Sequence, residues 1–145
     1  MTIGKDMRNI LAFLTKFGSI DRDIWQLQLS KGEKVIERKI FLKGKISSRN
    51  YIYAESILAL ERLEENFRKE LLETQTPIGK VWRQQRIETF KEIVETGKKP
   101  VGELSKYFSV PPESNLLFRS YCVLTNGKSV MMITEHFPES YFLED

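Results

Sequence analysis

The clearest structural signal in the chain is LLFRSYCVLTNGKSVMMITEHFP, residues 116–138. Two apolar and β-branched runs, Leu116–Leu124 and Val130–Phe137, flank the dipeptide Asn126-Gly127. Asn-Gly is the strongest short hairpin signal because both residues tolerate the left-handed backbone of a two-residue turn. Pro138 then ends the pairing, since proline has no N–H to donate to a ladder. The sequence therefore predicts an antiparallel hairpin at this position.

The length of the turn fixes the side of the hairpin on which Glu135 lies. Desolvation penalises the charged form of a carboxyl group among apolar neighbours, which suits a general acid. With three turn residues, the register shifts by one and Glu135 shares the face of Arg119, where an ion pair is expected instead. A solvated carboxylate near the strand end is a third interpretation. With two turn residues, Glu135 lies across from Phe118, on a face shared with Leu116, Ser120, Cys122, Met131 and Ile133.

A second hairpin is predicted upstream. The runs Val35–Lys43 and Tyr51–Leu58 are rich in aromatic and β-branched residues, and Lys43–Asn50 between them has the composition of a turn. Alternation along the second run puts Glu55 on one face with two tyrosines, one of which is Tyr53. These side chains either line a polar pocket or belong to an amphipathic outer surface.

The rest of the chain predicts helices and one further strand. Residues 6–17 carry apolar side chains at helical spacing, and residues 19–29 favour a short helix, although their alternation also fits a strand. Together with the hairpins, these elements predict an α+β fold in a single domain, residues 1–145. The other expected elements are a helix at 60–74, a short helix opening at Thr76-Pro77, a strand at 84–95 and a loop-rich segment at 97–114 with a helical turn at 103–107.

The composition disfavours several classes of protein. The 145 residues include 23 basic and 20 acidic side chains, and the net charge of +3 is spread along the chain. A nucleic-acid-binding protein usually concentrates its basic residues, so we expect no nucleic acid partner. No apolar run approaches the roughly 20 residues that cross a bilayer. The first residues lack the layout of a secretory signal, so we expect a cytoplasmic protein without a membrane partner.

The sequence offers few groups for metal or nucleophile chemistry. Cys122 is its one cysteine and His136 its one histidine. An internal disulfide or a cluster of histidine and cysteine ligands therefore cannot form, and no nucleophile motif accompanies either residue. The glycine-rich loops that bind phosphates are missing as well. We expect neither a metal nor an organic cofactor.

Several segments resemble, in their order, the chorismate lyase family. The stretches Arg38–Leu42 and Tyr53–Ser56 resemble the central hairpin of that family. The resemblance covers residues 35–140, and it rests on the order and spacing of the segments together rather than on any one motif. The other segments are Thr76-Pro77-Ile78-Gly79, Leu116-Leu117-Phe118-Arg119, Gly127-Lys128 and Thr134-Glu135-His136-Phe137-Pro138.

This resemblance implies both a fold and a reaction. The implied fold is a single antiparallel β-sheet with flanking helices that encloses an internal ligand pocket. The family removes pyruvate from chorismate and leaves 4-hydroxybenzoate, without a metal or an organic cofactor. Aromatisation drives that reaction, so the protein mainly positions the substrate and stabilises or protonates the departing enolpyruvyl group. The implied partner is a small aromatic or enolpyruvyl carboxylate.

The resemblance also implies site residues. Glu135 matches the essential glutamate of the family, and residues 97–114 would form part of a flap. Glu55 stands where related lyases carry a ligand-binding arginine, and a carboxylate cannot replace the bidentate grip of arginine on another carboxylate. Either Arg49, Arg83, Arg86 or Arg119 supplies the missing charge, or the substrate has changed or lyase activity has been lost. Leu116 matches the residue whose backbone contacts the ligand carboxylate. We predict Glu135 as the catalytic residue and, as substrate-binding residues, Leu116, Arg119, Glu55 and Tyr53.

Two other functions fit the same sequence. The implied fold also resembles the effector-sensing domain of GntR-type regulators, which bind small molecules without transforming them. A non-catalytic binding module for aromatic carboxylates is therefore the alternative. The other possibility is a relative that binds no ligand, in which Phe118, Met131 and Met132 pack through the interior beside Glu135.

Overall fold

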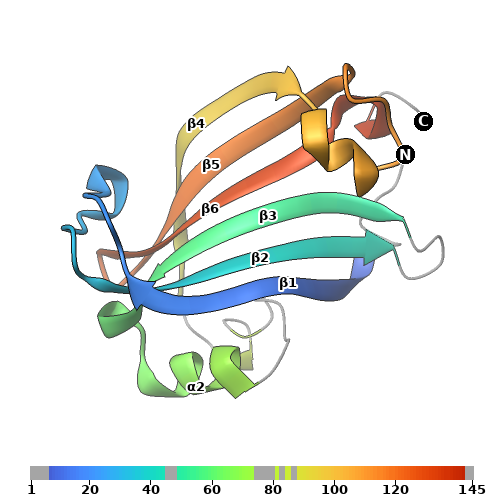
Figure 1. The fold of residues 1–145 in the computed structure, drawn as a ribbon. Coiled ribbons are helices and arrows are strands. Elements are labelled where there is room, and N and C mark those ends of the chain that lie inside the picture. Colours follow the sequence, from blue (N-terminus) through green and yellow to red (C-terminus); the bar gives the residue numbers. More distant parts are fainter. Residues whose placement is uncertain (1–6, 45–48, 74–80, 82–83, 86–87, 143–145) are drawn as a thin grey trace.

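The chain folds around one antiparallel sheet, seen in a computed structural model that describes residues 7–44, 49–73, 81, 84–85 and 88–142 (Figure 1). The strands lie in the order β1-β2-β3-β6-β5-β4. Their bounds are β1 (Met7–Ser19), β2 (Lys34–Gly44), β3 (Asn50–Ala59), β4 (Phe90–Pro100), β5 (Asn115–Thr125) and β6 (Lys128–Pro138). The helical elements in these ranges are α2 (Glu65–Glu73) and the 3-10 turns η1 (Trp25–Leu27), η2 (Leu60–Arg62), η3 (Gly102–Lys106) and η4 (Glu139–Phe142).

Both predicted hairpins are confirmed. β2 pairs antiparallel with β3, and β5 pairs antiparallel with β6. β3 and β6 also pair with each other, with Tyr53 opposite His136 and Leu58 opposite Met131. The two hairpins therefore form one continuous sheet, with β1 and β4 at its edges. The single antiparallel sheet implied by the resemblance is confirmed, although few helices flank it.

The turn of the C-terminal hairpin has the two residues that the sequence predicts. Asn126 and Gly127 both have positive φ, 51° and 77°. These are the left-handed conformations that a type I′ turn requires, and its twist matches that of the flanking strands. Thr125 and Lys128 pair directly on either side of the turn.

A β-bulge in β6 then changes the register of this hairpin. Leu124 pairs with Ser129, but the next residue of β5, Val123, pairs with Met131. Val130 is therefore an extra residue in β6, and it shifts every later pair by one position.

The predicted neighbours of Glu135 were wrong because of this bulge. Glu135 lies opposite Arg119 rather than opposite Phe118. A shift of one residue moves a side chain to the other face relative to its partner strand. Glu135 therefore does not share a face with Leu116, although the turn has the predicted length.

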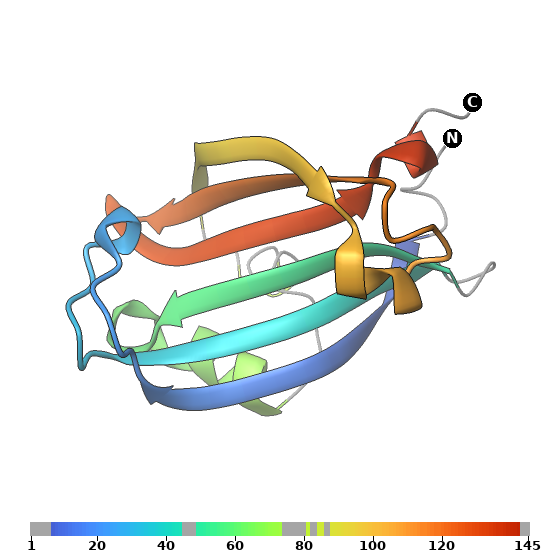
Figure 2. The same cartoon turned by 45° about the horizontal axis from the view of Figure 1, so that its top comes forward.

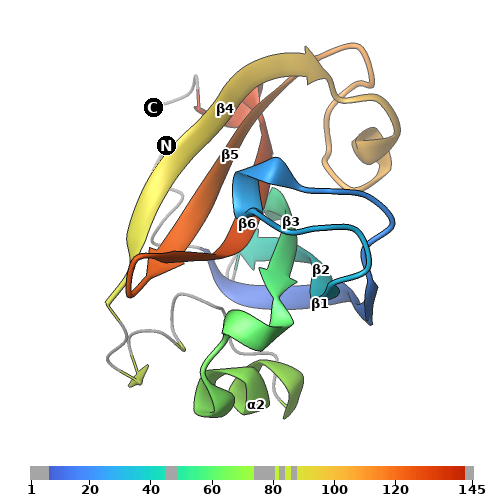
Figure 3. The same cartoon turned by 90° about the vertical axis from the view of Figure 1, so that its left-hand side faces the viewer.

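The two faces of the sheet have different covers (Figures 2 and 3). One face carries Ser56, Ile133 and Tyr121, which lie side by side on β3, β6 and β5. We call it the helix face because α2 packs on it. The opposite face carries Tyr53 and His136. We call it the loop face because η1 and η3 lie over its two ends.

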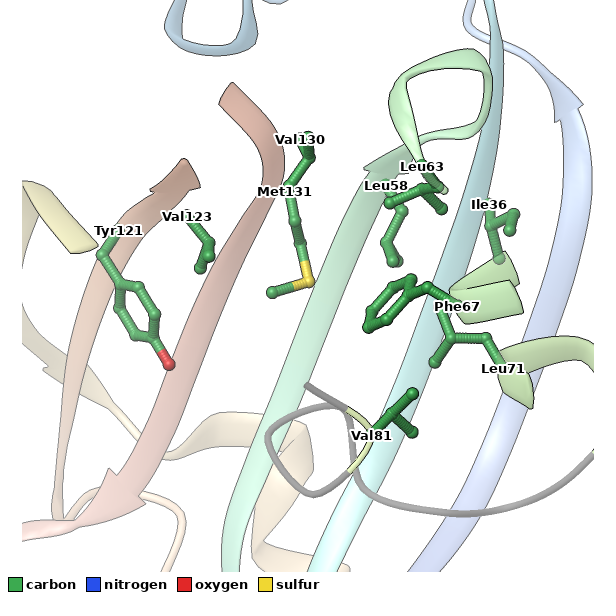
Figure 4. Close-up of a cluster of buried hydrophobic side chains, with 10 residues drawn as sticks. All are labelled: Ile36, Leu58, Leu63, Phe67, Leu71, Val81, Tyr121, Val123, Val130 and Met131. Carbon is green, nitrogen blue, oxygen red and sulfur yellow. The ribbon is translucent and has the colours of Figure 1, made fainter. Parts of the chain in front are cut away.

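The main core lies between the helix face and α2 (Figure 4). Phe67 and Leu71 are four residues apart on α2, so both point to the sheet. Phe67 is 1% exposed. Within the described residues, no helix is long and apolar enough to cross a membrane. The other members of this core are Ile36, Leu58, Leu63, Val81, Tyr121, Val123, Val130 and Met131.

Two smaller clusters cover the ends of the loop face. At one end, Ile24 and Leu27 beside η1 pack in a cluster with Cys122. At the other end, Val101 and Phe108 beside η3 pack in a cluster that includes Phe41. Loops with short 3-10 turns therefore cover the loop face, whereas helix α2 covers the helix face.

Arg62 fastens η1 to the sheet. Its guanidinium donates hydrogen bonds to the backbone carbonyl oxygens of Leu27, Gln28 and Ser129. Leu27 and Gln28 end the η1 turn, whereas Ser129 lies at the start of β6. One side chain therefore joins two segments that are about a hundred residues apart in the sequence.

Residues 6–17, which the sequence predicts as a helix, form strand β1 instead. β1 pairs antiparallel with β2 along its length. Register shifts lie between Met7 and Asn9 and between Ala12 and Leu14. Each irregularity adds a residue and interrupts the two-residue alternation of a strand, so the apolar positions fall at spacings that resemble a helix.

Other elements differ from prediction mainly at their ends. The segment 19–29 is mostly irregular and contains the short turn η1, and the strand predicted at 84–95 is β4, which begins later. The helix predicted at 60–74 is confirmed as η2 followed by α2, and the helical turn at 103–107 as η3. The short helix predicted at Thr76-Pro77 lies outside the described residues.

Phe67→Ala is expected to lower the free energy of unfolding by about 3–5 kcal/mol, because it leaves a cavity in the main core. Denaturation with guanidinium chloride measures the change. Lys69→Ala, at an exposed position of the same helix, is the matched control and should change the value by at most about 0.5 kcal/mol. Equal effects of the two substitutions would contradict the docking of α2 on the sheet.

Candidate functional site

Glu135 and Arg119 form an ion pair on the helix face. Arg119 Nε donates a hydrogen bond to Glu135 Oε1 at 2.7 Å. The side chain of Glu135 is 15% exposed and that of Arg119 is 51% exposed, so the pair lies at the border of the core. Direct pairing on β5 and β6 places the two residues. The structure therefore contains the ion pair that the sequence left as an alternative, not a carboxyl group among apolar side chains.

Tyr121 interacts with both members of this pair. It lies two residues after Arg119 on the same face of β5 and is buried. Burial is the main cause that raises the pKa of Tyr121 to about 12, and the charge and hydrogen bond of Glu135 add to it. The Arg119 Cζ atom lies 6.0 Å from the centroid of the Tyr121 ring. The hydroxyl group therefore stays protonated at neutral pH and serves Glu135 as a hydrogen-bond donor.

A buried arginine, Arg38, lies on the same face of the sheet. It projects from β2 opposite Ser56, and its side chain is nearly inaccessible, with the residue 3% exposed. Its Nε and Nη1 atoms are buried and have no hydrogen-bond partner within the described residues. Burial lowers the pKa of the guanidinium, yet an arginine in a protein keeps its charge. A buried cation without acceptors is costly, and proteins usually pair such groups.

Sheet geometry brings Arg38 and Glu135 near each other. β3 separates their strands, and Ser56 and Ala54 of β3 lie opposite Arg38 and Glu135, respectively. Two strand spacings and one two-residue repeat put the two Cα atoms about 12 Å apart on a flat sheet. Both side chains project from the helix face, so they can approach a common ligand from two sides.

Sequence reasoning missed Arg38. Along β2, the residues of the helix face read Ile36, Arg38, Ile40. An arginine between two isoleucines on the inward face of a strand is unusual, because arginine is seldom fully buried unless it is paired. This alternation was the available signal. The resemblance instead led to the neighbouring strand, where Glu55 stood in the place of an arginine.

The remaining predicted site residues lie on the opposite face. Leu116, Tyr53 and Glu55 project from the loop face, so the sheet separates them from Glu135. Leu116 is fully buried in the cluster near η3. The predicted site therefore divides into two groups: Glu135 and Arg119 on the helix face, and the other three residues on the loop face.

The loop-face residues form a polar group of their own with His136. The Tyr53 hydroxyl donates a hydrogen bond to Glu55 Oε1 at 2.9 Å, and His136 Nδ1 lies 3.2 Å from the Tyr53 carbonyl oxygen. Burial, followed by the bond to Glu55, raises the pKa of Tyr53. Burial, followed by the charge of Lys99, lowers the pKa of His136. Glu55 is exposed whereas Tyr53 and His136 are buried, so this polar group reaches from the interior of the loop face to the solvent.

The enclosed pocket around Glu135 stays a prediction. A cavity of about 280 Å³ lies at the end of β1 and is lined by residues such as Lys16 and Glu37. Another of about 270 Å³ lies beside Arg62 and Phe67. Neither includes Glu135. Among the described residues, no group of three histidine, cysteine or acidic side chains is placed to hold a metal ion.

Two further sequence expectations concern the surroundings of Glu135. The segment 97–114, expected as part of a flap, contains η3 and packs over the loop face rather than over Glu135. Of the side chains expected to fill the interior of a relative without a ligand, Met131 does lie in the main core. Phe118 and Met132 project from the loop face instead.

Comparison with known proteins gives one family. The model of the family described as "Chorismate pyruvate-lyase Rv2949c-like" matches residues 15–143. A chorismate pyruvate-lyase of Mycobacterium tuberculosis is 35% identical over 113 residues, which are 75% of this chain and 55% of that protein. A chorismate pyruvate-lyase of Mycobacterium leprae is 29% identical over 123 residues, 81% of this chain and 56% of that protein. The chain thus spans about half the length of these relatives.

Solved structures show the same fold in other proteins. A transcriptional regulator of the GntR family from Bacillus cereus superposes with a TM-score of 0.71, covering 94% of this chain and 95% of that chain. Its sequence identity is 10%, so the likeness concerns the fold alone. The family match extends over most of the chain, whereas the regulators share the architecture. The chain belongs to the Rv2949c-like chorismate pyruvate-lyase family.

Proposed function

We propose that this chain eliminates pyruvate from chorismate to give 4-hydroxybenzoate, or acts in the same way on a closely related enolpyruvyl acid. Membership of the family supports the class of reaction. The observation that carries the proposal is Arg38, a buried guanidinium with unpartnered donors on the face that also bears Glu135. Because the chain spans about half the length of its relatives, the activity of the whole protein is itself part of the proposal.

In this proposal Arg38 binds the ring carboxylate of the substrate. The planar fork of an arginine matches the two oxygens of a carboxylate. Ser56, buried opposite Arg38, places a hydroxyl group beside the same position. The anion gives acceptors to Nε and Nη1, which the described part of the protein leaves without partners, and such charge-assisted hydrogen bonds are strong. A separation of about 12 Å between the Cα atoms of Arg38 and Glu135 on a flat sheet leaves width for one aromatic ring.

Glu135 lies beside the bond that breaks. The ether bond between the ring and the enolpyruvyl group is cleaved, and the ring loses one hydrogen as it becomes aromatic. The departing group gains one hydrogen and leaves as pyruvate, so atoms balance. A carboxylate held by Arg119 and Tyr121 is oriented to accept and return this proton. Its two contacts fix the position in advance, and little reorganisation is needed during the reaction.

A second candidate function is binding of an aromatic carboxylate without turnover. The fold shared with a GntR-family regulator favours it. Arg38 would then anchor an effector, and the pair of Glu135 and Arg119 would only shape the site. Stabilisation of the protein against heat by 4-hydroxybenzoate, together with no conversion of chorismate, would identify this function.

Purified protein incubated with chorismate is expected to release 4-hydroxybenzoate faster than chorismate forms it without protein. Chromatography measures the product over time. Glu135→Gln should lower kcat by about 100-fold or more, because it removes the group that transfers the proton. Glu95→Gln is the matched control, since this exposed carboxylate lies on the edge strand β4 and should leave kcat unchanged. Equal rates for wild type and Glu135→Gln would contradict the role of Glu135.

Arg38→Met is expected to stabilise the ligand-free protein and to abolish ligand binding at the same time. Replacing an uncompensated buried charge by an apolar side chain of similar length should raise the free energy of unfolding by about 1–4 kcal/mol. Urea denaturation measures stability, and calorimetry measures the affinity for 4-hydroxybenzoate. A purely structural arginine gives the opposite result, with lower stability and unchanged affinity.

Tyr121→Phe is expected to reduce the loss of stability at alkaline pH. The pKa of Tyr121 rises from 10.0 to about 12 in the folded protein, so the neutral hydroxyl stabilises the fold. This contribution, about 3 kcal/mol, is complete below pH 10 and is lost as the pH rises through 12. Urea denaturation at pH values across this range tests it. Parallel curves for wild type and variant would show that Tyr121 titrates normally.

A further inference from the structure

Three charged residues of the helix face lie in an ordered row across the sheet. Arg38 projects from β2, Glu135 from β6 and Arg119 from β5. In the strand order of the sheet, the negative side chain therefore lies between two positive ones. The arrangement has a surplus of one positive charge, and that surplus is located at the buried end, on Arg38.

The contacts of Arg119 within the protein occupy only part of its hydrogen-bond donors. It gives its Nε–H to Glu135, and its Cζ atom lies over the Tyr121 ring at 6.0 Å. A guanidinium has five N–H donors. Within the described residues, its two Nη groups form no further hydrogen bond or ion pair. Since the side chain is 51% exposed, these groups are open to a ligand. Glu135 and Tyr121 hold the guanidinium in place without saturating it.

The distance between the two arginines suits a ligand with an anion at each end. β3 and β6 lie between their strands, and the two residues are offset by one two-residue repeat, as Arg38 and Glu135 are. Three strand spacings and this repeat put the two Cα atoms about 16 Å apart on a flat sheet. Both side chains extend over the same face and shorten this distance. A compact ligand with two carboxylates spans the remaining gap, and its central bond then lies near Glu135.

We infer that Arg119 binds a second carboxylate of the substrate and so makes the site selective for a dicarboxylate. This inference rests on the proposed function, in which Arg38 binds the first carboxylate. The dicarboxylate contacts both arginines, whereas the aromatic product keeps one carboxylate and contacts Arg38 alone. Arg119 therefore distinguishes substrate from aromatic product, and cleavage itself removes one of the two anchors of the ring.

The test compares two ligands in variants of Arg119. Arg119→Gln is expected to raise KM for chorismate by about 10- to 100-fold, the loss expected for one charge-assisted contact. The inhibition constant of 4-hydroxybenzoate should change by less than about threefold, because that ligand does not reach Arg119. Arg119→Lys should restore much of the affinity for chorismate, since it keeps the charge. Arg38→Gln should weaken both ligands.

Arg22→Gln is the matched control. Arg22 is an exposed arginine that also forms an ion pair, with Asp21 at 3.1 Å, and it lies outside the row of charges. Both constants should keep their wild-type values in this variant. Thermal unfolding of each variant checks that the fold is intact, which is expected for a half-exposed position.

Failure of this inference differs from failure of the proposed function. If Arg119→Gln weakens chorismate and 4-hydroxybenzoate equally, or weakens neither, Arg119 does not select the dicarboxylate, whatever the rate of turnover. If the wild type converts no chorismate, the proposed reaction fails. Calorimetry with both ligands then still tests Arg119. Arg119→Gln is again expected to weaken the binding of chorismate by about 10- to 100-fold and that of 4-hydroxybenzoate by less than about threefold.

Discussion

The extra residue Val130 in β6 is the constraint on which the candidate site depends. Without this bulge, a two-residue turn would align Glu135 with Phe118 and would place the glutamate and Arg119 on opposite sides of the sheet. With it, Glu135 and Arg119 lie directly opposite each other, and Arg119 Nε is 2.7 Å from Glu135 Oε1. Because β6 lies in the middle of the sheet and pairs on both sides, the shifted register also fixes how Glu135 lies relative to the residues of β3. A single inserted residue near the turn therefore determines the chemistry at the far end of the strand.

Burial of Arg38 sets the energetic character of this site. The protein buries a charge on the helix face, between two isoleucines of β2, without giving its Nε and Nη1 atoms an acceptor in the described residues. Apolar packing of the main core around Phe67 must hold the fold together despite this unfavourable term. Functional sites commonly carry such local destabilisation, which binding of the right ligand relieves. In the proposed site, the buried charge of Arg38 therefore lowers the stability of the ligand-free protein and raises its affinity for an anionic ligand.

Local signals predicted the parts of the fold that depend on local chemistry. The dipeptide Asn126-Gly127 identified its hairpin and turn type, because left-handed backbone conformations restrict the choice of residue. Bulges leave no such signal: Val130 is an ordinary valine, and the irregularities of β1 made residues 6–17 resemble a helix. The ion pair of Glu135 was foreseen as an alternative, but the missing arginine was sought among Arg49, Arg83, Arg86 and Arg119 rather than on β2. Arg38 was recognisable only as a charge on an apolar strand face, and its burial depends on contacts distant in sequence.

The three carbonyl oxygens bound by Arg62 link an early part of the chain to a late one. The full set of hydrogen bonds to Leu27, Gln28 and Ser129 forms only when Ser129 lies beside the η2 turn, and Ser129 belongs to the C-terminal hairpin. Contacts between such distant segments form slowly because a long loop must first close. During synthesis, η1 leaves the ribosome early but has no docking place until β6 follows. The end of the loop face that η1 covers therefore cannot complete these hydrogen bonds before β6 has joined the sheet.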